Sequence, residues 1–394
     1  MNNTVKVVHI GHVPFPPEKA RQAKLTPAAF YPGRWVLNLA LAQKEHTPIH
    51  PEIVVKVVGR FEPFSKTVEG IPVHYVPVHW RLRSATLFWF EARALTRKVR
   101  SLDPNIVHAH GTEGGNLLAA QRTGKPVVVT FQGVFLLMNK ILKPGPFARE
   151  RFVAMAERIA FRKLRFGICK SEYGQKEMAA LVPHAHLYSI PNTYVQPTCR
   201  PCFSKDECTL AFAGSIISRK GVHVLVAALR VLLKDFPELR LKMYGCHQNP
   251  LPGYEKDQID SLRKLLGERL EICGIVPREQ LDLGIAASRL LVAPSLEEMF
   301  GNQVVESLLV ATPVVVSDDT PMAENVRRFG NGWIFQKGSS ESLAETLRAS
   351  LRQAYCEETA RRAIQNIENY MSPRVVAERH LTVYSEVQAS WNGK

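Results

Sequence analysis

The chain has 394 residues, of which 45% are hydrophobic and 22% charged, an ordinary composition for a globular protein of two domains. Its net charge is +15, and the whole excess lies in residues 1–200, which hold 28 Lys and Arg against 12 Asp and Glu. No apolar stretch is long enough to span a bilayer, no secretory signal opens the chain, and the seven scattered cysteines form no disulfide framework. We therefore expect a cytoplasmic protein, with an anionic partner or simply a solvated basic surface on its first half.

Short β-branched runs alternate with helix-length segments through the first half of the chain. Residues 35–43 have helical spacing. The strands that we predict around that helix and after it are 5–10, 52–58, 105–110 and 126–130. This rhythm is typical of a parallel sheet with helices on both faces.

The same rhythm restarts after Pro191. A helix is predicted over 222–233, among strands at 209–213, 240–244, 290–293 and 313–316. The fold class that we predict is α/β, with two Rossmann-like, doubly wound domains. Their predicted bounds are 1–195 and 196–372, joined by a Pro- and Cys-rich linker at 191–205, and a C-terminal helix within 373–394 packs back on the first domain.

Two glutamates follow the predicted strand 290–293. Glu298 lies in the loop Glu298-Met299-Phe300-Gly301, and Glu306 lies eight residues later in an apolar helical run. Gly301 allows the backbone to approach a ligand closely. Asn302 and Gln303 begin a helix, and their backbone amides can hold a diphosphate. Alternatively, Glu298 caps the helix and Glu306 lies on a solvated face.

Two cations follow the predicted strand 209–213. That strand ends at Gly214-Ser215, and Arg219 and Lys220 precede Gly221 at the start of the next helix. At the carboxyl edge of a parallel sheet they could hold the phosphates of a leaving nucleotide, although they could also be ordinary surface charges. The Gly-x4-Gly-Lys-Ser/Thr pattern of a Walker A loop is absent from this segment.

Over residues 205–340 the sequence resembles glycosyltransferase family 4, retaining enzymes with the GT-B architecture of two such domains facing a central cleft. The matching residues come in the order of the family's elements: Ile190-Pro191-Asn192, Gly214, Lys220-Gly221, Glu298, Phe300-Gly301, Glu306, Pro313-Val314-Val315, Ser317 and Glu324. The chain departs from the family at Ser215, where the family has Arg, and at Ala311, where it has Gly.

The resemblance implies a role for each matched residue. Lys220 grips the diphosphate of a nucleotide sugar, with Arg219 supplying the charge missing at Ser215. Glu298 contacts the transferred sugar, Glu306 bonds the ribose, and the amides near Gly301 bind phosphate. Val276, in the loop 274–277, lies beside the nucleobase. The resemblance also implies that no metal or cofactor is needed.

Three loops of the first domain are expected opposite this donor site, at Gly33, His110 and Gln132. Family members often carry His where Gln132 stands, and two glycines where Gly33-Arg34 stands. Gln132 can bond sugar hydroxyls but cannot act as a titrating base. His110 ends its strand and is a better candidate than His108, although either histidine could simply be buried and bonded to backbone.

Two basic segments, 81–100 and 140–170, suggest a partner for the first half. The first carries six Lys and Arg beside Phe88-Trp89-Phe90, which suits an anionic membrane surface and a lipid-linked or cell-surface glycan acceptor, as in lipopolysaccharide or polysaccharide biosynthesis. Core-facing aromatics beneath a solvated basic face are the alternative. Cys199 and Cys202 lack the second pair that a zinc finger requires.

The function we predict is therefore retaining transfer of a sugar from a nucleoside-diphosphate donor to an acceptor hydroxyl. Two other classes stay open. A sugar-nucleotide epimerase or a phosphorylase could use the same fold, and a nucleic-acid-binding protein could use the basic half. The nucleic-acid reading leaves Glu298, Glu306 and Lys220 without a role, so no nucleic acid is expected as a partner.

Overall fold

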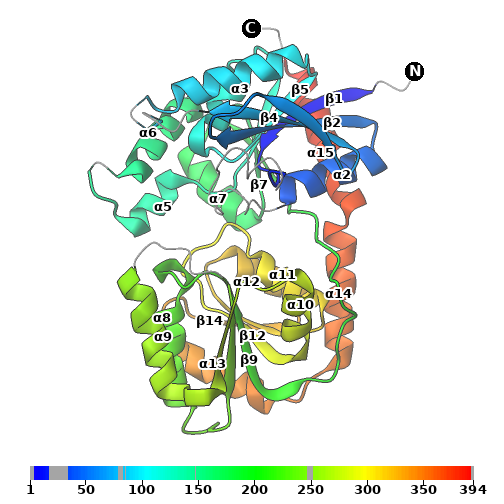
Figure 1. The fold of residues 1–394 in the computed structure, drawn as a ribbon. Helices are drawn as coiled ribbons and strands as arrows, with labels where there is room; N and C mark the ends of the chain where they lie inside the picture. Colours follow the sequence, from blue (N-terminus) through cyan, green and yellow to red (C-terminus); the bar gives the residue numbers. More distant parts are fainter. Residues whose placement is uncertain are drawn as a thin grey trace. The chain divides into compact units, whose positions relative to one another are not determined.

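The computed structural model describes residues 4–391 except 17–33, 79–82, 85, 147 and 246–251. The chain divides into two compact units, one formed by Met1–Thr193 with Met371–Lys394 and the other by Tyr194–Tyr370 (Figure 1). The boundaries predicted from the sequence were 195 and 372. None of the described helices has the length and apolar character needed to cross a bilayer.

The first unit is built on an eight-stranded sheet with the order β3-β4-β2-β1-β5-β6-β7-β8. Its strands are β1 (Val5–Gly11), β2 (Ile49–Val58), β3 (Phe64–Val68), β4 (Ile71–Val78), β5 (Ile106–His110), β6 (Val127–Thr130), β7 (Phe166–Cys169) and β8 (His186–Ser189). All neighbours pair in parallel except β3 and β4.

The β3–β4 hairpin corrects the expectation of a purely parallel sheet. Its turn residues Glu69 and Gly70 have φ of 49° and 81°, the two positive values of a type I′ turn. Only the glycine adopts that conformation freely, so the pair Glu-Gly is a weak sequence signal for a hairpin. The antiparallel strand therefore went unpredicted.

The helices of the first unit cover its sheet and follow most strands. They are α2 (Trp35–His46), α3 (Trp89–Ser101), α4 (Asn116–Gln121), α5 (Phe135–Leu142), α6 (Arg149–Phe161), α7 (Glu172–Leu181) and α15 (Pro373–Ala389), with the 3-10 turn η2 (Glu113–Gly115).

The C-terminal helix α15 belongs to the core of the first unit. Ser372 caps it by accepting a hydrogen bond from the Val375 amide, and Pro373 occupies its first turn. It packs beside α2 (Figure 1). Its apolar face joins one buried cluster with residues of α2 and the sheet, which include Val7, Leu39, Ile106, Val128, Val376, Val383 and Val387.

The second unit has a six-stranded parallel sheet with the order β11-β10-β9-β12-β13-β14. Its strands are β9 (Asp206–Ala213), β10 (Arg240–Tyr244), β11 (Leu270–Gly274), β12 (Ser288–Ala293), β13 (Val314–Ser317) and β14 (Gly332–Phe335). Its helices are α8 (Val222–Leu232), α9 (Pro252–Leu266), α10 (Arg278–Ala287), α11 (Asn302–Leu309), α12 (Pro321–Phe329), α13 (Ser340–Arg352) and α14 (Glu357–Met371), with the 3-10 turns η3 (Ser218–Lys220) and η4 (Gly267–Arg269).

The strand order of the second unit decides where its ligand-binding edge lies. β9 is central, and its neighbour β12 enters the sheet after two intervening strands, so the loops that follow β9 and β12 meet at the carboxyl edge. This is the topological switch point at which open α/β sheets bind ligands. Arg219 and Lys220 follow β9 and Glu298 follows β12, so they lie on these two connections.

Candidate active site

The loops after β9 and β12 bring Lys220, Arg219 and Glu298 together. The Lys220 ammonium donates a hydrogen bond to Glu298 Oε1, and Arg219 Nη1 lies 3.8 Å from Glu298 Oε2. Ser295 donates a further bond of 3.2 Å to Oε1. The side chains of Lys220 and Glu298 are only 12% and 11% exposed. The site therefore holds two cations around one carboxylate, with one positive charge in excess.

Two glycines explain how the Lys220 loop reaches this position. A Cβ on Gly221 would lie 1.9 Å from the Pro294 carbonyl oxygen, so only glycine allows the contact. The Leu296 amide then donates a 2.7 Å bond to the Arg219 carbonyl, which joins the two loops. Gly214 lies beside the Lys220 side chain, whose Cε would be 3.6 Å from an added Cβ.

The amino end of α11 lies next to this cluster in the same loop. Gly301 adopts φ 81° as the residue before the helix, and among the described residues no side chain caps it. Asn325 of α12 bonds the Phe300 carbonyl at 3.1 Å, which holds the turn in place. Asn302 and Gln303 begin the helix, and its positive dipole end favours an anion at this position.

Glu306 has a protein partner that the sequence analysis missed. Arg278, the first residue of α10, lies 2.9 Å from Glu306 and 2.7 Å from Asp282. The Glu306 side chain is 23% exposed, so one side of the carboxylate stays open to a ligand. Val276 lies just before α10, in the loop after β11. The sequence signal that could have drawn attention to Arg278 was its spacing from Asp282, one helical turn further along.

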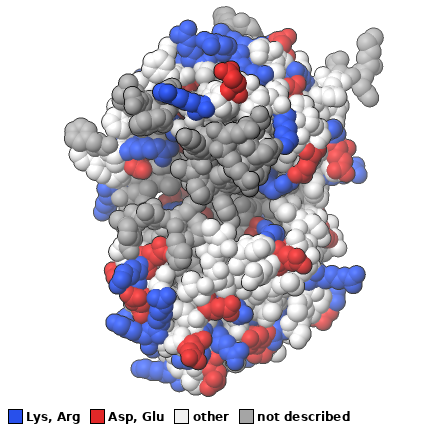
Figure 2. Space-filling view, viewed as in Figure 1, with Lys and Arg blue, Asp and Glu red and all other residues white. Residues whose placement is uncertain are grey.

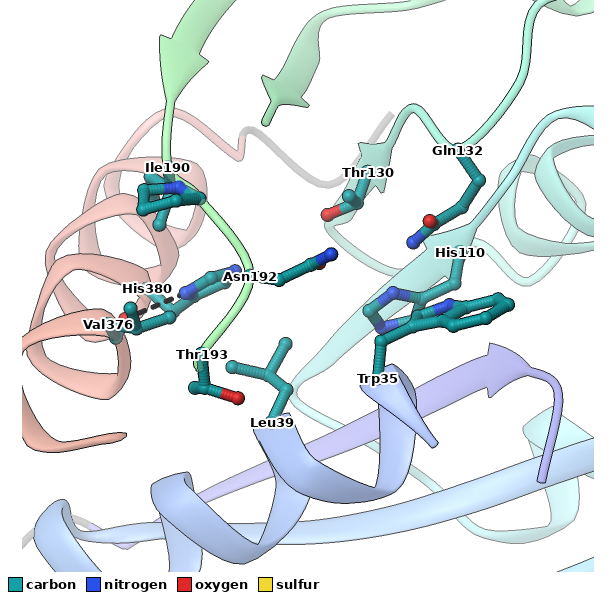
Figure 3. Close-up of a pocket in the computed structure, with 11 residues that line it drawn as sticks. Trp35, Leu39, His110, Thr130, Gln132, Ile190, Asn192, Thr193, Val376 and His380 are labelled. Atoms are coloured by element: carbon teal, nitrogen blue, oxygen red, sulfur yellow. Dashed lines mark hydrogen bonds between the residues drawn. The ribbon is translucent and has the colours of Figure 1, made fainter. Parts of the chain in front are cut away.

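The first unit has its own pocket at the carboxyl ends of β5 and β6 (Figure 3). It contains His110 and Gln132, two of the predicted residues, while Gly33 lies outside the described residues. The other lining residues are Trp35, Leu39, Thr130, Ile190, Pro191, Asn192, Thr193, Val376 and His380.

Lys170, directly after β7, completes the polar side of this region and was not predicted. Its ammonium donates to Gln132 Oε1 and lies 5.5 Å from the centre of the Trp35 ring. Burial lowers the pKa of Lys170 to about 7, because a cation away from water is unfavourable. Gln132 Nε2 and Trp35 Nε1 are buried without a partner among the described residues. The region thus offers several donors to an oxygen-rich ligand.

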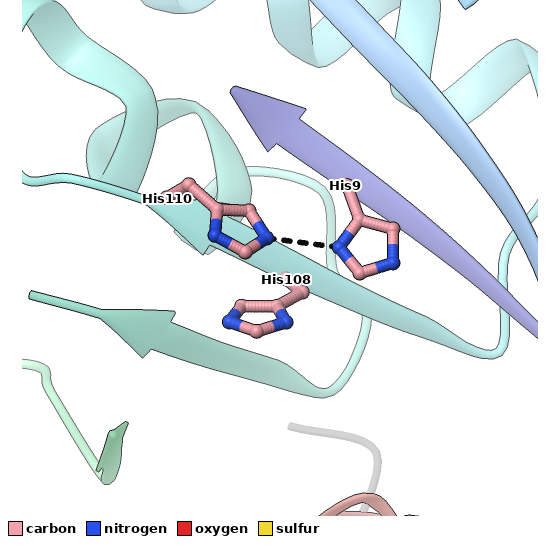
Figure 4. A group of neighbouring side chains, drawn as sticks. All are labelled: His9, His108 and His110. Carbon is pink, nitrogen blue, oxygen red and sulfur yellow. Dashed lines mark hydrogen bonds between the residues drawn. The ribbon is translucent and has the colours of Figure 1, made fainter. Parts of the chain in front are cut away.

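Three histidines of β1 and β5 lie together behind this pocket (Figure 4). Within the described part of the chain, His9, His108 and His110 are the one group whose nitrogens lie close enough, within 4.8 Å, to suggest a metal ion. However, His9 Nδ1 and His110 Nε2 are 2.9 Å apart, within hydrogen-bond distance, and the rings of His108 and His110 are stacked with their centres 4.1 Å apart. His108 Nδ1 and Nε2 lie 2.6 and 2.7 Å from the hydroxyls of Tyr384 and Thr130, so this ring is already used in hydrogen bonds. The group therefore suits hydrogen bonds better than a metal.

The basic segment 81–100 is partly surface and partly core. Arg81 lies outside the described residues, and Phe88, expected at a membrane surface, is 1% exposed. Phe88 packs against Val153 and Ala156 of α6, which corrects that expectation. Trp89 and Phe90 are 39% and 60% exposed. Figure 2 shows Lys and Arg side chains gathered over α3, which carries the exposed Arg93, Arg97 and Arg100.

Two family models match the chain. Residues 32–194 match the family model described as Glycosyltransferase Family 4, and residues 202–370 match the model described as Glycosyl transferases group 1. The chain belongs to the family 4 type of glycosyltransferases. The second match contains Lys220, Glu298 and Glu306, and the first contains His110 and Gln132.

Curated relatives carry related names. A D-inositol 3-phosphate glycosyltransferase of Streptomyces avermitilis is 27% identical over 62% of this chain and 57% of its own length. The gpi3 subunit of the phosphatidylinositol N-acetylglucosaminyltransferase of Schizosaccharomyces pombe is 23% identical over 81% of this chain and 69% of its own. The chain thus spans little more than half of the first relative.

Solved structures share the fold over almost the whole chain. Sucrose-phosphate synthase of Thermosynechococcus elongatus has a TM-score of 0.77 at 16% identity, covering 98% of this chain and 100% of that one. Anabaena HepE, solved with UDP and glucose, has a TM-score of 0.67 at 17% identity, covering 97% and 99%. These neighbours establish the GT-B architecture, and nothing in the comparisons favours an epimerase, a phosphorylase or a nucleic-acid-binding protein.

Proposed function

We propose that the chain transfers a glycosyl group from a nucleoside-diphosphate sugar to an acceptor hydroxyl, with retention of anomeric configuration. The observation that carries the proposal is the cluster of Lys220, Arg219 and Glu298 beside the amino end of α11. Two cations and a helix terminus form a site for a diphosphate, and the carboxylate lies within the same site.

The proposed reaction forms a bond between the acceptor oxygen and the anomeric carbon while the bond to the diphosphate oxygen breaks. The electron pair leaves with the diphosphate, which takes up the proton that the acceptor hydroxyl loses. Lys220 and Arg219 stabilise the charge that develops on the leaving group, because fixed cations interact more strongly with it than water does. Glu298 orients the sugar, and Glu306 with Arg278 lies where a ribose is bound.

The acceptor is proposed to bind the first unit at the pocket of His110 and Gln132. The polar groups of this pocket favour an acceptor that carries hydroxyls, and the basic excess of residues 1–200 favours one that also carries an anionic group. The relatives named for inositol phosphate and phosphatidylinositol glycosylation point in the same direction.

Replacement of Lys220 tests the donor site directly. Lys220→Met, supplied with a panel of nucleotide sugars, is expected to lose about 100-fold or more in kcat, the usual effect of removing one donor to a developing charge. Lys234→Met, an exposed lysine after α8, is the matched control and keeps full turnover. Equal turnover by both variants would exclude Lys220 from the reaction.

No resident metal is proposed, because the leaving charge already faces Lys220, Arg219 and the α11 amides. Turnover is therefore expected to be unchanged after exhaustive treatment with a chelator. The measurement is the steady-state rate before and after chelation, with Mg²⁺ or Mn²⁺ added back. Loss of turnover that a metal restores would show that these residues are insufficient.

A further inference from the structure

A chain of buried hydrogen bonds begins and ends in the pocket of the first unit. It links residues of three strands and two helices, Thr130, His108, Tyr384, Gln43, His9 and His110 in that order. The donor–acceptor distances along it are 2.7, 2.6, 3.0, 2.9 and 2.9 Å. Both terminal residues, Thr130 and His110, line the pocket (Figure 3). The resemblance assigned a position to His110 but gave no role to Gln43 or Tyr384.

The three histidines that these hydrogen bonds link are neutral. His9 and His108 are fully buried and His110 is 3% exposed. Burial lowers the pKa of His9 to about 3 and holds the pKa values of His108 and His110 well below their usual range. A neutral imidazole has one N–H and one lone pair, so each ring donates at one nitrogen and accepts at the other.

Gln43 sets the direction of the hydrogen bonds on its His9 side. Its carbonyl Oε1 can only accept, so His9 Nε2 carries the proton and donates to it. His9 Nδ1 is then a lone pair, which accepts from the N–H at His110 Nε2. Neutral His110 therefore has no proton on Nδ1. This nitrogen is buried and has no partner among the described residues.

On the Tyr384 side of Gln43, the hydrogen bonds are donated away from the Gln43 side chain. Gln43 Nε2 donates to the Tyr384 hydroxyl, which donates in turn to His108 Nδ1. His108 Nε2 then carries the proton and donates to Thr130 Oγ1. The Thr130 hydroxyl proton is left to point away from His108. The pocket accordingly presents an acceptor at His110 and a donor at Thr130.

We propose that Gln43 and Tyr384 are positioning residues that fix the tautomer of His110, and that His110 Nδ1 accepts a hydrogen bond from a hydroxyl of the bound acceptor. This inference rests on the proposed glycosyl transfer for the identity of the ligand. It makes helix α15, which carries Tyr384, part of the acceptor site. A ligand with a hydroxyl that can both donate to His110 and accept from Thr130 fits this pair of groups.

The tautomer can be measured without any substrate. In the full chain with ¹⁵N-labelled histidine, we expect an unprotonated, pyridine-type Nδ1 and a protonated Nε2 for His110, whose signals are identified by their loss in His110→Asn. A protonated Nδ1 in the wild-type protein would overturn the proposal. This result does not depend on turnover, so it is separate from the fate of the proposed function.

Two variants then test the positioning role. Gln43→Met and Tyr384→Phe are expected to give mixed tautomers at His110 and a loss of about tenfold in kcat/KM. Tyr188→Phe is the matched control, since Tyr188 also bonds α15, through Glu386 at 2.6 Å, but lies outside the chain of bonds. If both variants keep the wild-type tautomer and kcat/KM, the proposal fails. If Gln43→Met does not fold, the wild-type spectrum and Tyr384→Phe still decide it.

Discussion

At the scale of single residues, the contact between Lys220 and Glu298 raises the question of how a diphosphate gains access to the lysine. The Lys220 ammonium bonds Glu298 Oε1 in the structure, and a diphosphate competes with that carboxylate for it. A carboxylate next to a phosphate site weakens anion binding through like-charge repulsion, so the position of Glu298 is better explained by a role in the transfer step.

Glu298→Gln separates these two effects. The variant keeps the side-chain shape but removes one negative charge, so we expect nucleoside diphosphate to bind as tightly as in the wild type, or more tightly. The value of kcat should fall by about 100-fold because the sugar loses its charged contact. Calorimetry gives the first quantity and steady-state kinetics the second. Weaker diphosphate binding in the variant would contradict the assigned role.

Lys170 predicts a dependence of stability on pH. Its pKa is about 7 in the folded protein and 10.5 in an unfolded chain, so between these values the unfolded state binds more protons. Stability is then expected to rise with pH from about 7 to about 10, by up to roughly 1 kcal/mol per unit. Urea unfolding at pH 7.5 and 9.5 measures it, and Lys170→Met should lose this contribution. An equal pH slope in both proteins would refute the burial of a neutral amine.

The sequence predicted residues that a local pattern marks and missed residues that depend on distant partners. Lys220 and Glu298 each follow a short apolar run that predicts a strand, where parallel sheets place their ligand residues, and the structure brings them into contact. Lys170 also follows a strand, but it belongs to the pocket through its hydrogen bond to Gln132, which is 38 residues away in the sequence. Tyr384 lies 276 residues from His108, and no periodic pattern in the sequence predicts a contact at that separation.

At the scale of elements, α15 shows how one helix supports both fold and site. Its apolar residues Val376, Val383 and Val387 enter the core of the first unit, and Tyr384 reaches the histidines from the same helix. The C-terminal helix predicted within 373–394 forms over Pro373–Ala389, and Ser372-Pro373 is the strong helix start that marks it. The β3–β4 hairpin lacked such a signal, since its turn Glu69-Gly70 is not a common type I′ pair.

Val383→Ala tests the contribution of this helix. Val383 is 3% exposed, so truncation removes about two methylene equivalents and leaves a small cavity, at a cost of about 2 kcal/mol in unfolding free energy. Ser385→Ala, two residues along and exposed, is expected to change it by less than about 0.5 kcal/mol. Chemical unfolding of the full chain measures both. Equal values would show that α15 contributes little to the core.

At the scale of the whole molecule, charge is divided unequally along the chain. Residues 1–200 hold the entire positive excess, and the α5–α6 region has a pocket that combines Lys140, Lys143 and Arg158 with the half-exposed Met155. Cations beside apolar side chains are typical of surfaces that bind anionic lipid headgroups. We propose that this region holds the first unit at an anionic membrane surface.

Vesicle binding tests that proposal. The full chain is expected to bind vesicles with anionic lipid and not neutral ones, and to dissociate as salt is raised, because the attraction is screened. Lys140→Glu with Lys143→Glu should weaken binding at least tenfold, by about 1 kcal/mol for each lost charge and more for each reversal. Arg230→Glu with Lys234→Glu, exposed in the second unit, is the control. Equal binding by both double variants would exclude the α5–α6 region.

The central claim is that the second unit binds the diphosphate of a nucleotide sugar at Lys220 and the amino end of α11. A crystal structure of the full chain with a nucleoside diphosphate measures this most directly. We predict phosphate oxygens within hydrogen-bond distance of Lys220 Nζ and of the amides near Gly301, with the Lys220–Glu298 bond broken or lengthened. A nucleotide bound elsewhere, with Lys220 still held by Glu298, would contradict the account.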